Sequence, residues 1–340
     1  MKYIPSEGYE LNTTLFNTNV ILEQCTDIER FTIFKVYSKS FNEVDIRRIK
    51  IDGDDVGFII PSFSLLSMEH DYYNVNYFQS FCDACIKWFL INHDSTEESE
   101  VELESLFSED LGFIVLSNSR FTSTEENNRK LFFELLSYGT YVDIRNSNTQ
   151  DMAKNALFPE RTLPESTRIS MTSKTNKAIL DDFIFETFYS ILFKETDHFL
   201  QFFYLYQSIE TLIEFVMAHE YSTVKGKIDE FGNSVTSQQL KKLVETINES
   251  LQERKRINKL CHDYTANYSD DFNTKESLIN FIIEHLNSEF DPDSDIGSSI
   301  YEIRNKSFHE FRTLRNSEKL SEITSHSFNY ILHLISSYKH

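Results

Sequence analysis

The sequence predicts an α+β protein, in which a mixed α/β N-terminal domain precedes an all-α antiparallel helical bundle. Strand-like alternation is confined to residues 1–165, and no convincing strand pattern occurs from Lys177 onward. The 340 residues include only 8 Gly and 5 Pro, which favours helices over a turn-rich β-sandwich. We therefore place a regulatory or sensor domain at residues 1–165 and the helical domain at residues 166–340.

In the first domain, residues 30–39 alternate and are rich in β-branched and aromatic side chains, which predicts a strand. Residues 46–61 have the pattern of a hairpin with an Asp-Gly turn. Further strands are predicted at residues 111–118 and 140–146, and helices at residues 77–92 and 128–139, the second closed by Gly139. Residues 157–176, with two Pro and a cluster of Ser and Thr, are the best candidate for a linker.

The second domain shows helical periodicity almost throughout. In the helix predicted at residues 198–220, apolar side chains recur at spacings of three and four, namely Phe202, Leu205, Ile209, Leu212, Ile213 and Val216. The other predicted helices span residues 178–194, 237–264, 273–290, 299–314 and 317–339, and Asn273 or Thr274 would cap the third of these. The helix count and the short connections favour a bundle.

Charge and cysteine content exclude several classes of function. The net charge of -21 disfavours general coating of nucleic acid, although a local basic patch can still attract RNA. Four Cys form no disulfide framework, and the N-terminus lacks a signal-peptide pattern, so we expect a cytoplasmic protein without a membrane span. Cys82 and Cys85 have zinc half-site spacing, but their apolar neighbours favour buried thiols, and we expect neither a metal nor a cofactor.

Arg304, Asn305 and His309 form the candidate catalytic set, on a predicted helix near the end of the sequence. At about 100° per residue, Asn305 and His309 lie one turn apart and the three residues span an arc of roughly 140°. Histidine can transfer protons near neutral pH, and arginine can bind a phosphate through two parallel hydrogen bonds. These residue types suit cleavage of an RNA phosphodiester, with Asn305 orienting the phosphate or the imidazole.

This pattern resembles the HEPN superfamily, whose motif is an arginine, a polar residue and a histidine late in an all-α domain. Many HEPN domains are metal-independent endoribonucleases of toxin–antitoxin and phage-defence systems, and they typically form dimers. An early helix of ApeA-like HEPN domains carries a Tyr-Gln-x-x-Glu pattern, which Tyr206, Gln207 and Glu210 match here. The resemblance covers roughly residues 178–340 and implies that these three residues support the site. Glu210 would pair with Arg304 across the bundle, or would simply be solvated.

Two further features bear on the site. Residues 256–262 contain a second arginine–histidine pair, Arg256 and His262, which is either the true motif, an RNA-contacting surface or a plain helix end. The helix dipole would favour basic residues at such an end. Residues 301–320 contain five basic and three acidic residues, which gives a local net charge of +2. We expect RNA to contact six basic residues within residues 254–259 and 301–320, namely Arg254, Lys255, Arg256, Lys306, Arg312 and Arg315.

The leading hypothesis is thus a HEPN endoribonuclease of a toxin or abortive-infection system, with RNA as its substrate. A homodimer through the C-terminal helical domain would bring two copies of the motif into one cleft. An antitoxin or a phage-derived trigger would act as a regulatory partner. The alternative is a non-catalytic HEPN-type helical module that binds a partner protein, which would suit the acidic surface.

Overall fold

The computed structural model describes residues 2–3, 12–15, 18–21, 28–39, 41, 46–65, 67, 70–72, 76–92, 101–102, 107–146, 168–172, 174–231, 236–268, 271–286, 290–291, 293–309 and 319–340. These residues fall into two compact units, one up to Lys174 and one from Thr175 onward. The protein is α+β, because the central sheet belongs to the first unit and most helices belong to the second. The expected boundary at residue 165 lies outside the described residues.

The first unit is built on a six-stranded sheet with the order β10-β5-β6-β8-β4-β9. Its strands are β4 (Phe31–Ser38), β5 (Arg47–Ile51), β6 (Asp54–Pro61), β8 (Leu111–Ser117), β9 (Thr140–Asp143) and β10 (Arg168–Met171). Every neighbouring pair is antiparallel except β10 and β5. Two small antiparallel pairs accompany the sheet, β1 (Lys2–Tyr3) with β7 (Val101–Glu102), and β2 (Asn12–Leu15) with β3 (Thr18–Ile21).

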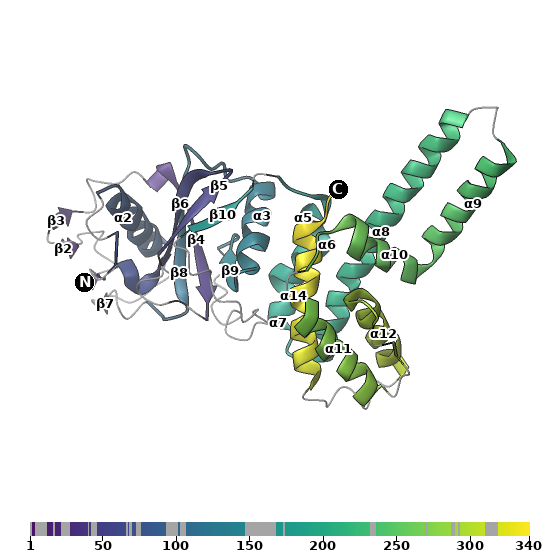
Figure 1. The fold of residues 1–340 in the computed structure, drawn as a ribbon. Coiled ribbons are helices and arrows are strands. Elements are labelled where there is room, and N and C mark those ends of the chain that lie inside the picture. Colours follow the sequence, from purple (N-terminus) through teal and green to yellow (C-terminus); the bar gives the residue numbers. More distant parts are fainter. Residues whose placement is uncertain are drawn as a thin grey trace. The chain divides into compact units, whose positions relative to one another are not determined.

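Helices α2 (Asn76–Ile91) and α3 (Glu125–Leu136) lie on opposite sides of this sheet (Figure 1). Short 3-10 helices η1 (Ile28–Arg30) and η2 (Ser62–Leu65) adjoin the strands. Ring contacts fasten α2 to the sheet, since Phe81 packs on Phe58 at 5.0 Å between ring centroids. On α3, Phe132 packs on Tyr141 of β9 at 5.5 Å.

Most sequence expectations for this unit are confirmed. The predicted hairpin is β5 and β6, and its Asp52-Gly53 turn has positive φ at both residues, as a type I′ turn requires. The thiols of Cys82 and Cys85 are fully buried, and burial raises the pKa of both well above the usual thiol value. Gly139 has positive φ but follows the C-cap Ser137 by two residues, one position later than a C′ glycine.

The predicted linker is wrong at residues 168–171, because Arg168–Met171 form strand β10, which pairs parallel to β5. The strand alternates exposed and buried residues, and Ile169 and Met171 face the core. Four residues give too short a pattern to be recognised among Ser and Thr, and pairing with an existing strand decides the conformation.

All secondary-structure elements described in the second unit are helices. Its elements are α5 (Lys177–Leu180), α6 (Asp182–Glu186), the π-helical turn η4 (Thr187–Ile191), α7 (Leu192–Lys194), α8 (His198–Phe231), α9 (Ser237–Leu251), α10 (Glu253–Lys259), the π-helical turn η5 (Leu260–Tyr264), α11 (Asp271–His285), α12 (Ile296–His309) and α14 (Lys319–Ser337). The far half of α8 and α9 project from the other helices as an arm (Figure 1). None of the described helices is long and apolar enough to cross a membrane.

The first half of α8 forms the centre of this unit and packs along α14. The six apolar residues predicted to share one face of α8 are all at most 3% exposed. Two predicted helices are interrupted, because Asp181 caps α6 by accepting a hydrogen bond from Ile184 N, and Gln252 is extended between α9 and α10. Helix α11 begins at Asp271, two residues before the predicted caps. The side chain of Thr274 is buried within it.

Candidate active site

Helix α12 carries the candidate catalytic set. Its N-terminus is capped by Asp295, whose Oδ1 accepts a hydrogen bond from Ser298 N at 2.6 Å. Ile296, Ile300 and Ile303 are at most 1% exposed and anchor one face of the helix. With that face fixed in the core, the part-exposed residues at 304–306 are held on a rigid element rather than on a loop.

The Arg304 guanidinium is held by two neighbours. Its Nη2 donates to Glu210 Oε1 of α8 at 3.0 Å, and its Nη1 donates to Asn305 Oδ1 at 3.0 Å. Of the two alternatives left open for Glu210, a solvated side chain and a pair with Arg304, the structure shows the pair. The Oε2 of Glu210 accepts a hydrogen bond from Gln207 Nε2 at 2.6 Å, so Gln207 orients the carboxylate that orients the arginine.

Tyr206 forms the floor below the guanidinium. Its side chain is fully buried, and Arg304 Cζ lies 5.0 Å from the centroid of its ring, within cation–π range. The hydroxyl donates to Glu253 Oε1 of α10 at 3.0 Å. Burial, together with the neighbouring Glu253, raises the pKa of Tyr206, so the phenol stays protonated and donates this bond at all ordinary pH values.

Three helices thus meet at Arg304: α8 supplies Tyr206, Gln207 and Glu210, α10 supplies Glu253, and α12 supplies Asn305. Sequence reasoning placed all of these except Glu253. Glu253 belongs to no recognised motif, and it reaches the site because the chain breaks at Gln252 and a new helix begins there.

His309 is the last residue of α12, five residues after Arg304. Its backbone is helical, but its side chain lies outside the described part of the structure, as do Arg312 and Arg315 entirely. Lys306 is half-buried on α12. The geometry of the site is therefore defined on the arginine side, and the predicted position of the imidazole rests on the helix register alone.

The second arginine–histidine pair lies near the other end of α12. Asn258 Nδ2 is 3.4 Å and His262 Nε2 is 3.6 Å from Asp295 Oδ2. Nine residues of helix separate Asp295 from Arg304, a rise of about 14 Å. The contacts of this pair involve none of the residues that hold Arg304.

The expected helix-dipole explanation for the basic run at residues 254–256 is wrong. These residues occupy the first turn of α10, where the dipole disfavours cations, rather than the end of a long helix. Arg254 and Lys255 are exposed, and Arg256 Nη1 contacts Met217 Sδ of α8 at 3.4 Å. Another cause must account for three cations at this position.

No protein-family model, curated protein or solved structure matches this chain. Within the described ranges, no group of three or more His, Cys, Asp or Glu side chains is placed to hold a metal ion.

Proposed function

We propose that the protein is a metal-independent endoribonuclease of the HEPN type, acting in a toxin or anti-phage defence system. The observation that carries the proposal is the guanidinium of Arg304, held between Glu210 and Asn305 above the ring of Tyr206. An arginine fixed on several sides can meet a phosphate without losing further conformational entropy, which is how electrostatic preorganisation lowers a barrier.

In the proposed reaction, the 2′-oxygen of a ribose attacks the adjacent phosphorus and the bond from phosphorus to the 5′-oxygen breaks. His309 takes the proton of the 2′-hydroxyl or gives one to the departing 5′-oxygen. Arg304 offsets the negative charge that builds on the phosphate, and Asn305 holds the guanidinium in place. The products are a 2′,3′-cyclic phosphate and a 5′-hydroxyl.

The hydrogen bonds to Glu210 and Asn305 hold both terminal nitrogens of Arg304, so the guanidinium is oriented before a phosphate arrives. The six basic residues named for RNA contact, three of which lie in the first turn of α10, would bind the flanking phosphates.

A second candidate function is a non-catalytic helical module of the same type that binds a partner protein. It is favoured by the ion pair itself, because Glu210 offsets the charge of Arg304 and such a pair can serve the fold alone. Exposed apolar side chains on the α8–α9 arm favour it too, among them Tyr221 at 71% and Leu240 at 56% exposure.

One experiment separates the two. Purified protein is incubated with total RNA in the presence of EDTA, and the RNA is resolved by length. Discrete cleavage that is lost in both Arg304→Ala and His309→Ala supports the enzyme. Intact RNA at high protein concentration, with both variants folded and unchanged in behaviour, supports the binding module.

A further inference from the structure

A polar-rimmed pocket opens in the N-terminal unit, far in sequence from the candidate active site. It has a volume of about 520 Å³, within the range of small-molecule sites. The turn between β5 and β6, the segment from β8 into α3, helix α3 itself and the end of β10 all contribute to its wall. Three stretches that are distant in sequence, residues 51–56, 119–131 and 171–172, thus converge on one cavity.

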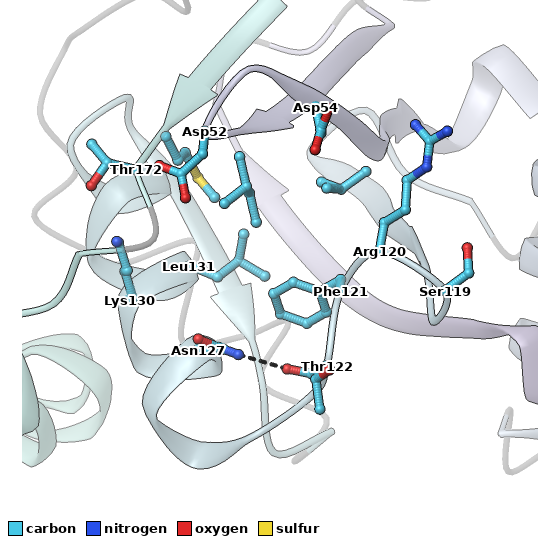
Figure 2. A pocket seen from close by; sticks show the side chains of 13 residues that line it. Asp52, Asp54, Ser119, Arg120, Phe121, Thr122, Asn127, Lys130, Leu131 and Thr172 are labelled. Atoms are coloured by element: carbon cyan, nitrogen blue, oxygen red, sulfur yellow. Dashed lines mark hydrogen bonds between the residues drawn. The ribbon is translucent and has the colours of Figure 1, made fainter.

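The floor of the pocket is apolar. Phe121 and Leu131 lie side by side in its middle (Figure 2), and they are 4% and 1% exposed. Met171 of β10 is also buried there. A floor of this kind suits a flat ring or a short apolar body, which it would shield from water.

The rim is polar and has two ends. Lys130, Asp52 and Thr172 gather at one end, and Arg120, Asp54 and Ser119 gather at the other (Figure 2). Between them, Asn127 Nδ2 donates to the carbonyl oxygen of Thr122 at 2.8 Å, which ties the start of α3 to the preceding segment.

Lys130 differs from the other charged groups because it is buried. It is 5% exposed, whereas Asp52, Asp54 and Arg120 are exposed. Its Nζ donates to the carbonyl oxygen of Lys174, which engages one of the three ammonium hydrogens. Charges that face water are screened, so the buried cation dominates the interaction of the pocket with a ligand charge.

We propose that this pocket binds a small organic anion with a flat apolar body, whose phosphate or carboxylate group contacts Lys130. The apolar body would cover Phe121 and Leu131, and Asp54 at the other end of the rim would accept hydrogen bonds from ligand hydroxyl groups. This inference does not depend on the ribonuclease proposal, because the site lies entirely within the other unit.

The charge balance around Lys130 supports an anion. Burial lowers the pKa of Lys130, while Glu134 and Glu126 of its own helix and Asp52 of the facing turn act in the opposite direction. Desolvation is the largest of these effects, so the ammonium pays a burial cost that those carboxylates only partly offset. A ligand anion at this position would offset more of it.

The test uses the full chain and calorimetry, with nucleoside 5′-monophosphates and phenylacetate as probes. The matched neutral probes are the nucleosides and phenylacetamide. We expect at least one anion to bind with a Kd below about 1 mM, and its neutral counterpart to bind about tenfold more weakly or worse, as a charge-assisted hydrogen bond implies. Phosphate and carboxylate probes distinguish the two sources of the charge.

Three variants test the assignment to Lys130. Lys130→Gln should weaken binding of the anion about tenfold or more, and Lys130→Arg should restore part of it. Asp52→Asn should tighten binding of the anion about two- to fivefold, because it removes a partly screened negative charge that repels the anion. Asparagine accepts positive φ and suits the Asp52-Gly53 turn, so this variant keeps the hairpin even if the Lys130 variants fail to fold.

The proposal predicts a pH dependence of anion binding that a purely structural role for Lys130 would not produce. Anion affinity should fall as pH rises through the lowered pKa of Lys130, since the neutral amine no longer attracts the ligand. Failure of every anion to bind better than its neutral counterpart would overturn the proposal. So would binding that is unchanged in both Lys130→Gln and Asp52→Asn.

Discussion

Replacement of Arg304 by alanine is the perturbation that tests the proposed site most directly. Its stability cost can be worked from the contacts. A partly exposed ion pair with Glu210 contributes about 0.5–1 kcal/mol, the cation–π contact with Tyr206 about 0.5–1 kcal/mol, and the hydrogen bond to Asn305 about 0.5–1.5 kcal/mol. The loss should therefore be roughly 1.5–3.5 kcal/mol, which most folded domains survive.

The expected loss of activity is much larger. Removal of a single preorganised group that stabilises transition-state charge lowers the rate about 10²- to 10³-fold. Arg304→Lys should lose most of this as well, because an ammonium lacks the planar fork that contacts two phosphate oxygens. Glu210→Gln keeps Arg304 but weakens its support, so we expect an intermediate loss of about tenfold.

The assay is single-turnover cleavage of a labelled RNA in EDTA, with urea unfolding of each variant measured in parallel. Arg256→Ala is the matched control, since it removes one of the six basic residues expected to bind flanking phosphates but none of the contacts that hold Arg304. Its guanidinium donates a hydrogen bond to Met217 Sδ of α8. It should retain activity within about fivefold, as for one screened charge at a surface. Folded Arg304→Ala with activity comparable to that control would refute the assignment.

Four further predictions follow from the sequence and the structure. Cleavage should persist in EDTA, leave a 2′,3′-cyclic phosphate and spare DNA, because the 2′-hydroxyl is the nucleophile; mass spectrometry of the products checks this, and cleaved DNA or complete dependence on Mg²⁺ would contradict it. His309→Ala should abolish RNA cleavage and cellular toxicity, whereas His262→Ala should reduce both much less. Cleavage kinetics with the reverse order would assign the catalytic motif to the second pair, Arg256 and His262. Burial raises the pKa of Asp83 to about 6. The folded state then binds more protons than the unfolded state, so this group lowers stability as pH rises from about 4 to above 6. Asp83→Asn should therefore raise the free energy of unfolding by roughly 1–3 kcal/mol at pH 8 and little at pH 4. Urea titrations at both pH values would show this difference. An equal gain at both pH values would exclude the ionisation of Asp83 as the cause. Finally, sedimentation of the full chain at micromolar concentration should show a homodimer formed through the helical unit, and a strictly monomeric, fully active protein would refute the shared cleft.

Periodicity in the sequence was sufficient to predict most of the elements. The alternation in residues 30–39, the Asp-Gly turn at residues 52–53 and the apolar spacing along residues 198–216 each express a local rule, and each of these predictions is confirmed. Local rules failed where a distant partner decides the conformation. Strand β10 exists because it pairs with β5, and the break at Gln252 allows α10 to return against α8 and α12.

In the candidate site, too, local patterns predicted the residues of one helix, whereas the contacts between helices depended on the tertiary structure. The sequence by itself supplied Arg304, Asn305 and His309 on one helix, because a fixed 3.6-residue period places neighbouring residues without any knowledge of the fold. It also offered Tyr206, Gln207 and Glu210 as partners, with Glu210 equally explained as a solvated side chain. Only the tertiary structure decided that Glu210 reaches Arg304, that Tyr206 lies beneath it, and that Glu253 anchors Tyr206. Contacts between residues 47 to 94 positions apart depend on how helices pack, and packing is set by the whole core rather than by any local pattern.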